Sequence, residues 1–239
     1  MKKSLKNTII SVKIKESEKT MVTFDIIKND PAIRTYIREA DRSLEALGYT
    51  EHSFAHVTFV AERAASLLSW LGYGERTVEL ARIAGFLHDI GNIVNRTDHS
   101  QSGALIAFRI LDKYGMDASE IAEIVTAIGN HDEGTGVPVS AVAAALILGD
   151  KSDVRRTRVR NSEISSFDIH DRVNYSATSS DIILSEDKRS VTLKLNIDTE
   201  ISPIMDYFEI FLGRMKLCRS AAGKLGVDFK LCINEQQFI

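Results

Sequence analysis

Cysteine is scarce in this chain, long apolar runs are absent, and each shortage excludes a class of protein. Cys218 and Cys232 are the only cysteines and have no paired spacing, which excludes a disulfide scaffold and a thiolate zinc site. The longest apolar run, Ala141 to Leu148, is too short to cross a bilayer. No apolar core of signal-peptide length follows the first three residues, Met-Lys-Lys. Together these absences predict a reduced cytoplasmic protein that does not enter a membrane.

A strong charge of either sign is also missing. The 30 Lys and Arg residues nearly balance 33 Asp and Glu residues, for a formal net charge of -3. Such a chain has no general attraction for nucleic acid or membrane, so phosphate binding would need local basic clusters or metal ions. The hydrophobic fraction of 44% and the length of 239 residues are typical of a soluble globular protein. The length allows one large core, or one domain and a smaller one.

Hydrophobic periodicity and capping signals predict a helical first part of the chain. Residues 1–29 mix polar and β-branched residues and are interpreted as an N-terminal arm or short strand. Asp30-Pro31 starts a helix that ends near Leu47, because Asp can cap and Pro fits the first turn. Asp117 with Glu120 resembles a capping box. Further helices are expected over about 53–71, 78–87, 100–114, 118–131 and 139–148.

The composition changes after about residue 150. Residues 182–184 and 191–198 flank a charged turn and predict a β-hairpin, because apolar residues alternate along the second strand. A long helix over 203–225 and an alternating strand over 227–233 follow. The predicted fold class is therefore mainly α: a helical domain over 30–160, then a C-terminal α+β module over 161–239 in the order strand-strand-helix-strand.

Separated points in the helical part carry side chains that bind metal ions. They are His56, His88-Asp89, His99, His131-Asp132 and Asp150. A single histidine on an apolar helix is more often a core residue than a ligand, but Asp89 and Asp150 lie within or directly after apolar stretches. A buried carboxylate is costly unless it is paired or coordinates a metal. Imidazole together with carboxylate suits zinc, iron, manganese or nickel.

This pattern, over roughly residues 50–155, resembles the HD superfamily of metal-dependent phosphohydrolases. The resemblance implies an HD-domain helical bundle in which four residues bind one metal ion: His56, His88, Asp89 and Asp150. It also implies a second ion, because His99 and His131 resemble the extra histidines of the HD subgroups that hold two metals, with Asp89 as the bridge. Two divalent transition-metal ions are expected, iron or manganese before zinc or nickel.

The segment from His131 to Pro138 is similar to part of the HD-GYP cyclic-dinucleotide phosphodiesterases, with departures. Asp132 stands where that family has a second histidine, and Val137 stands where it has the tyrosine of Gly-Tyr-Pro. Asn92 replaces a lysine that follows the His-Asp pair in that family. These changes argue against cleavage of cyclic dinucleotides and leave the metal ligands intact. Asp132 is either a further carboxylate ligand or a cap for the following loop.

Several remaining polar residues allow two interpretations. His52, one turn before His56, is an accessory ligand or a partly exposed histidine, and His170-Asp171 is interpreted as a surface or domain-interface pair. Lys151 and Arg155 directly follow Asp150 and are the candidates for holding a substrate phosphate, with a solvated charged face as the alternative. RNA binding is disfavoured because no aromatic residues interleave the arginines.

The resemblance predicts hydrolysis of a nucleotide or other small phosphate ester by a metal-activated water, with Asp89 bridging the two ions. Asp89, Lys151 and Arg155 are the expected catalytic residues. One alternative is a di-iron HD oxygenase, which has the same ligand set. The other is a regulatory metal-containing binding module that uses the C-terminal unit as its partner or dimer surface. The expected partner is a small phosphorylated substrate, and a homodimer is a further expectation.

Overall fold

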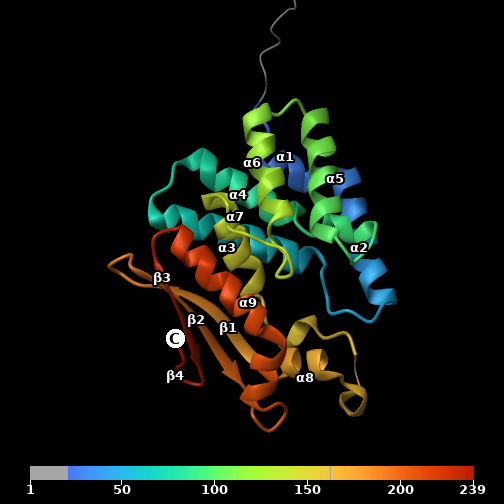
Figure 1. Cartoon of the computed structure of the whole chain (residues 1–239). Coiled ribbons are helices and arrows are strands. Elements are labelled where there is room, and N and C mark those ends of the chain that lie inside the picture. The colour runs from blue at the N-terminus through green and yellow to red at the C-terminus, as the bar shows by residue number, and fades with distance from the viewer. Residues whose placement is uncertain (1–20, 162) are drawn as a thin grey trace, which may run out of the picture.

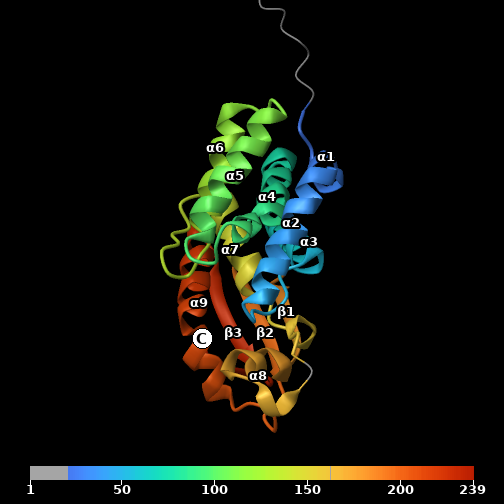
Figure 2. The ribbon, with the colours of Figure 1, turned by 90° about the vertical axis from the view of Figure 1, so that its right-hand side faces the viewer.

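The computed structural model describes residues 21–161 and 163–239, which form a helical bundle and a small sheet covered by further helices (Figure 1). A view turned by 90° shows the same arrangement, with α5 and α6 at one end and α8 at the other (Figure 2). The predicted fold class is therefore confirmed. None of the helices within the described ranges has the length and apolar character to cross a membrane.

Apart from α1, the helices of the bundle match the predicted ranges to within a few residues. They are α1 (Phe24–Asn29), α2 (Pro31–Ala46), α3 (Phe54–Leu71), α4 (Glu75–Leu87), the 3-10 helix η1 (Ile90–Ile93), α5 (His99–Lys113), α6 (Ala118–Gly129) and α7 (Ala141–Lys151). Asp30 caps α2 and Asp117 caps α6, each accepting a first-turn N–H. Glu120, expected to complete a capping box with Asp117, makes a two-pronged ion pair with Arg76 of α4.

The interpretation of residues 1–29 as an arm or short strand is wrong for residues 24–29, which form α1. The Thr23 side chain accepts the N–H of Ile26 and starts the helix. Phe24 and Ile27, three residues apart, share one face and are buried in the core. A six-residue helix is too short to show a periodic pattern in the sequence. Residues 1–20 of the predicted arm lie outside the described residues.

The helix α7 is buried along Val142–Gly149, which explains why its sequence is a continuous apolar run. It packs against α3, and α3 packs in turn against α4. Glycines allow both close crossings. A Cβ on Gly85 of α4 would lie 2.7 Å from the Cα of Ala61, and a Cβ on Gly149 would lie 3.0 Å from the carbonyl oxygen of Val60. These close approaches bring the ends of the three helices together.

The C-terminal module has the predicted strand-strand-helix-strand order, with two small additions. Its elements are α8 (Ile169–Ser176), β1 (Ala177–Leu184), β2 (Ser190–Ile197), α9 (Ile204–Lys224), β3 (Asp228–Ile233) and β4 (Gln236–Gln237). The strands lie in the order β1-β2-β3-β4, with β1 antiparallel and β3 parallel to β2. The parallel pair is possible because α9 provides the crossover.

Two features of the module differ from the sequence prediction. Helix α8 was not predicted, because its eight residues are mostly polar and carry little periodicity. Asp168 starts it by accepting the N–H of Asp171 at 2.8 Å. Strand β1 begins at Ala177, not at Ile182, because its first residues are small and polar but still pair with β2.

Helix α9 joins the module to the bundle. It lies between the sheet and α7 (Figure 1), and its buried residues Phe211, Met215 and Cys218 belong to the same continuous hydrophobic core as the bundle. The division of the chain at residue 160 is not tested by this packing and stays a prediction. The consequence for function is that α7 contacts both parts of the molecule.

We expect Gly85→Ala to destabilise the protein, because the new methyl group would meet the backbone of α3 at Ala61. Such overpacking costs about 1–3 kcal/mol. Gly213→Ala in α9 is the matched control, because a Cβ there meets nothing within 4 Å. It should stabilise by roughly 0.5–1 kcal/mol through helix propensity. Urea unfolding of both variants measures the difference, and equal free energies of unfolding would contradict the close crossing.

Candidate metal centre

Six of the seven residues predicted to bind metal ions lie together where the bundle helices converge, and the seventh, Asp132, is described below. They are His56 of α3, His88 and Asp89 between α4 and η1, His99 at the start of α5, His131 after α6 and Asp150 of α7. All are buried except Asp150, whose side chain is 12% exposed. Residues distant in sequence thus form one cluster, near the place where α3 packs against α4 and α7.

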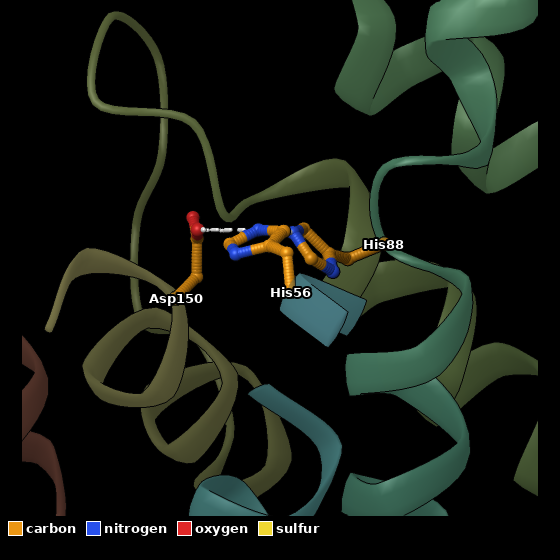
Figure 3. Close-up of side chains that lie close together, drawn as sticks. All are labelled: His56, His88 and Asp150. Atoms are coloured by element: carbon orange, nitrogen blue, oxygen red, sulfur yellow. Dashed lines mark hydrogen bonds and ion pairs between the residues drawn. The ribbon is translucent and has the colours of Figure 1, made fainter. Parts of the chain in front are cut away.

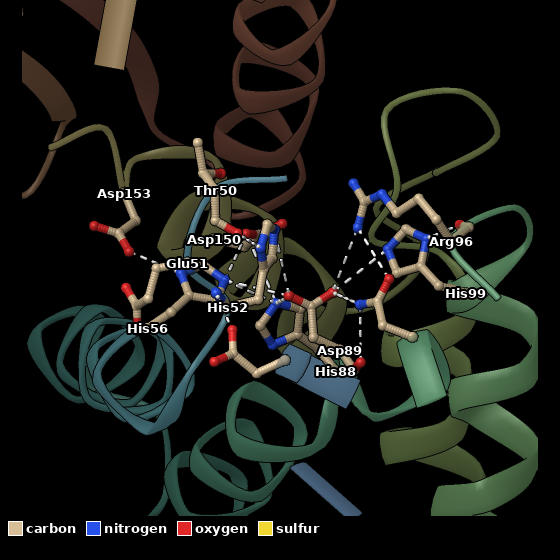
Figure 4. Close-up of polar contacts among 12 residues, drawn as sticks. Thr50, Glu51, His52, His56, His88, Asp89, Arg96, His99, Asp150 and Asp153 are labelled. Carbon is tan, nitrogen blue, oxygen red and sulfur yellow. Dashed lines mark hydrogen bonds and ion pairs between the residues drawn. The ribbon is translucent and has the colours of Figure 1, made fainter. Parts of the chain in front are cut away.

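The Asp89 carboxylate lies between two pairs of imidazoles, and Figure 4 shows His56 and His88 on one side of it and His99 on the other. Its Oδ2 atom is 3.5 Å from the Nε2 of His56 and 3.2 Å from the Nε2 of His88. Its Oδ1 atom is 3.5 Å from the Nε2 of His99 and 4.0 Å from the Nε2 of His131. Each oxygen of Asp89 therefore faces its own pair of histidines, as expected of a carboxylate that bridges two ions.

Asp150 completes the first of these two groups. Its Oδ1 atom is 3.5 Å from the Nε2 of His56 and 3.7 Å from the Nε2 of His88 (Figure 3). These three residues, and separately His88 with Asp89 and His131, have ligand atoms close enough together to hold an ion. His88 belongs to both of these sets of three residues and lies near the middle of the cluster.

The outer nitrogen of each histidine ring is held by an acceptor. The Nδ1 atoms of His88, His99 and His131 lie 2.8, 3.0 and 2.6 Å from the backbone carbonyl oxygens of Gly85, Arg96 and Ile128. A carbonyl can only accept, so each Nδ1 carries a proton and donates it. In the neutral rings the Nε2 atoms then present lone pairs to the cluster.

With all four rings neutral, as metal binding requires, these lone pairs would face one another across short distances. The Nε2 atoms of His56 and His88 are 3.3 Å apart, and those of His99 and His131 are 3.2 Å apart. Two lone pairs at this separation repel unless a cation lies between them. Two bonds of about 2.1 Å to one ion, at angles of about 90–109°, would separate the nitrogens by roughly 3.0–3.4 Å. The donor set therefore fits a metal ion at each pair.

The electrostatics of the cluster also call for positive charge. Burial alone would raise the pKa of Asp89, but the charge of His88 and a hydrogen bond from His56 hold it well below the usual value. Burial lowers the pKa of His131 far enough to keep that ring neutral. For His56, burial is outweighed by hydrogen bonds to Asp150, Asp153 and Asp89, which raise its pKa to about 10. A bound cation can replace the proton that these carboxylates attract.

Asp153 is a functional residue that the sequence analysis missed. It is fully buried, and its Oδ2 atom accepts a hydrogen bond of 2.7 Å from the Nδ1 of His56. Arg155 pairs with this carboxylate through its Nε atom at 2.5 Å, and Arg158 approaches it to 3.8 Å. The arrangement orients the His56 ring toward the cluster and increases its basicity. In the sequence, only the position of Asp153 three residues after Asp150 could have indicated this role.

Lys151 and Arg155, the predicted phosphate-binding residues, both have carboxylate partners. The Nζ of Lys151 lies 2.8 Å from the Oδ2 of Asp150 and 2.6 Å from the Oε2 of Glu133. Glu133 in turn accepts a 2.9 Å bond from the Nε of Arg214, on α9. A chain of ion pairs thus links Asp150 to the C-terminal module. A phosphate contact of Lys151 or Arg155 is not tested by this geometry.

Both interpretations of Asp132 find a counterpart in the structure. Its Oδ2 atom accepts the N–H of Gly134 at 3.3 Å, as a loop cap would, and its Oδ1 atom lies 4.0 Å from the Nε2 of His99. His52 is partly buried, with its Nε2 atom 4.0 Å from the Oδ2 of Asp89. Its position beside Asp89 is that of an accessory group. Whether Asp132 binds an ion stays a prediction.

A cavity of about 450 Å³ lies beside the cluster, at the junction of the bundle with the module. The bundle side includes His52, Arg96 and Arg158, and the module side includes Asp171, Asn174 and Arg214. His52 and Arg96 connect the cavity to the cluster, because each lies 4.0 Å from an Asp89 oxygen. A larger cavity of about 600 Å³ between α2 and α5 has no histidine in its lining.

Comparison with protein families gives a match to the HD domain over residues 49–172, just over half of the chain. The chain belongs to the HD-domain family. The predicted family is thereby confirmed. The HD match includes every residue of the cluster and extends to α8, beyond the predicted boundary at residue 160.

Individual relatives of this HD-domain chain are distant. The uncharacterized protein MJ1020 of Methanocaldococcus jannaschii is 26% identical over 162 residues, which are 59% of this chain and 62% of that protein. The chain thus spans less than two thirds of that relative. The crystal structure of a predicted HD superfamily hydrolase from an uncultured Thermotogales bacterium is 24% identical, with a TM-score of 0.40. That alignment covers 55% of this chain and 73% of the other, and the TM-score is too low to bear on the chemistry.

We expect the protein to bind two transition-metal ions per chain. Asp89→Asn should lose both ions, because the negative charge of Asp89 faces both pairs of histidines. His131→Ala should lose mainly the ion at His99. His170→Ala is the control, because this exposed histidine lies outside the cluster. Elemental analysis of each purified variant measures the number of metal ions per chain. One ion per chain in both the unaltered protein and His131→Ala would contradict two sites.

We expect Lys151→Met to destabilise the fold strongly, because it leaves the largely buried Asp150 without the cation that it shares with the more exposed Glu133. Breaking a buried pair of this kind costs about 3–5 kcal/mol. Lys194→Met is the control: its ion pair with Glu235 is largely exposed, and such pairs contribute about 0–1 kcal/mol. Chemical unfolding at neutral pH compares the two. Similar losses in both variants would show that Lys151 is not a structural cation.

Proposed function

We propose that this HD-domain protein is a metal-dependent phosphohydrolase that acts on a nucleotide or other small phosphate ester. The observation that carries the proposal is the arrangement around Asp89, where each carboxylate oxygen faces a pair of imidazole Nε2 atoms. Such a cluster suits two ions near one another, with a bridging carboxylate between them. Paired ions of this kind serve phosphoryl transfer in many enzymes.

Two sets of residues would hold the ions. His56, His88 and Asp150 would bind one together with the Oδ2 atom of Asp89, and His99 and His131 would bind the other together with its Oδ1 atom. Bound metal ions would lower the pKa of a water molecule and neutralise charge on the phosphoryl oxygens. The protein itself supplies the geometry, because hydrogen bonds to backbone and to Asp153 fix the ring orientations.

Arg96 is the residue that we assign to the substrate phosphate. Its Nη1 atom lies 4.0 Å from the Oδ1 of Asp89 and 3.3 Å from the Oδ1 of Asn92 (Figure 4). Its guanidinium lies over the ring of Tyr49, with 5.7 Å between them, and it lines the cavity. A planar guanidinium at this point can bind two phosphate oxygens at once.

Lys151 and Arg155 receive supporting roles in this proposal. Lys151 balances the charge of Asp150, and Arg155 balances that of Asp153 behind His56. Their effect on the substrate would therefore be indirect, through the ligands that they position. Arginines on the cavity wall favour an anionic substrate, which supports a phosphohydrolase over an oxygenase of small polar molecules.

Hydrolysis is tested with the full chain loaded with manganese or iron, assayed for phosphate release from a panel of phosphate monoesters. Asp150→Asn should abolish activity. Arg96→Met should raise KM by about 10-fold with normal metal content, because a charged hydrogen bond to the substrate is lost. Arg109→Met, an exposed residue on α5, is the control.

The same assay includes cyclic dinucleotides, which should be poor substrates. Asn92 donates to Asp89 at 3.0 Å in the place where the HD-GYP enzymes have a lysine. No phosphate release from any ester by protein with full metal content would overturn the proposed function. Unchanged kinetics in Arg96→Met would overturn the assignment of Arg96 alone.

A further inference from the structure

The cavity beside the metal centre has hydrogen-bond donors on its bundle side. Arg158 is 4% exposed, and its Nε and Nη1 atoms donate to the carbonyl oxygens of Glu51 and Asp153 at 3.0 and 2.8 Å. Its Nη2 atom makes no hydrogen bond to any residue within the described ranges. This nitrogen is available to donate to a ligand in the cavity, so Arg158 and Arg96 favour an anion at this side.

On the module side, helix α8 contributes acceptors, whereas Arg214 of α9 is already paired with Glu133. Asn174 is 5% exposed, and its Nδ2 atom donates to the carbonyl oxygen of His170 at 2.9 Å, which leaves its Oδ1 atom as an acceptor. Among the described residues, the only side-chain donor to the Asp171 carboxylate is Asn161, at a long 3.5 Å. Burial and the nearby charge of Asp168 raise the pKa of Asp171, as expected of a carboxylate with too few donors.

The two sides belong to different parts of the fold. Arg96 precedes α5, whereas Asp171 and Asn174 lie on α8, and α5 and α8 occupy opposite ends of the molecule in both views (Figures 1 and 2). Arg96 and Arg158 thus line the bundle side of the cavity, and the α8 part of its wall offers the acceptors Asp171 and Asn174. A ligand that fits it has acceptors at one end and donors at the other.

The size of the cavity restricts that ligand. A volume of about 450 Å³ lies in the lower half of the range, about 300–1,000 Å³, that holds one small molecule. If the phosphate group of such a ligand lies near Arg96, the rest of the molecule must carry the donors that face α8. In a small phosphate ester, hydroxyl groups can serve as these donors. Neighbouring hydroxyls can each donate to a different acceptor, and Asp171 and Asn174 lie three residues apart on one face of α8.

We propose that the cavity selects phosphate esters with adjacent hydroxyl groups, and that Asp171 and Asn174 accept hydrogen bonds from those hydroxyls. This assignment rests on the proposed function for the phosphate end of the ligand. Two sources share the chemistry, a ribonucleotide and a small polyol or sugar phosphate. Both residues are specificity-determining groups supplied by α8, a helix beyond the metal ligands in sequence.

The experiment measures binding by isothermal titration calorimetry on the full-length, metal-loaded protein, with two matched pairs of probes. Adenosine 5′-monophosphate is compared with its 2′-deoxy form, and glycerol phosphate with propyl phosphate. In at least one pair, the hydroxyl-rich member should bind about 10-fold tighter or more, because the other member leaves Asp171 and Asn174 without donors. The pair that shows the preference identifies the source.

Asp171→Asn and Asn174→Leu should each bring the ratio of the two affinities within a pair closer to one. The affinity of the hydroxyl-poor probe should stay unchanged. Glu186→Gln, in the exposed turn between β1 and β2, is the control and should keep the preference. Thermal unfolding checks that each variant is folded. Equal affinity within both pairs in the unaltered protein, or a preference that survives both α8 substitutions, would overturn the proposal.

The result is separable from the test of hydrolysis. A hydroxyl preference that depends on Asp171, found in a protein that releases no phosphate from any ester, would support the cavity and reject the phosphohydrolase. Hydrolysis of p-nitrophenyl phosphate without any hydroxyl preference would support the phosphohydrolase and reject the assignment of α8.

Discussion

The burial of negative charge at Asp89 is the constraint on which this structure depends. The side chain is 6% exposed in the middle of an apolar bundle, where an uncompensated carboxylate is very costly. Four imidazoles surround it, and their outer nitrogens are already committed, three to backbone carbonyls and that of His56 to Asp153. The cluster is therefore complete only with cations, and the glycine contacts of α3 with α4 and α7 serve to bring its parts within reach.

The C-terminal module participates in this balance of charge. Lys151 compensates Asp150, Glu133 compensates Lys151, and Arg214 of α9 compensates Glu133. Because α7 is buried between the bundle and α9, the candidate metal ligand Asp150 lies where the two parts meet. The same junction contains the cavity, so the module helps both to position a ligand and to shape the space for a substrate.

Basic residues close to one another in sequence have different environments in the fold. Arg155 and Arg158 both approach Asp153, but Arg158 also lines the cavity, while Arg155 lies over Phe59 of α3. Charge density along the chain therefore did not indicate which cation meets a substrate. Arg96, isolated in sequence, lies 4.0 Å from the proposed bridging carboxylate.

The sequence by itself determined the order of most elements and the identity of six clustered candidate ligands, because helix periodicity and the His-Asp pattern are properties of short stretches of chain. It did not reveal α1 or α8, which are too short or too polar to show a period. Only the tertiary structure decided the pairing of His56 with Asp153, 97 residues apart, and the position of α8 across the cavity from Arg96. Such contacts depend on how helices cross, and the close crossings at Gly85 and Gly149 are made between segments distant in sequence.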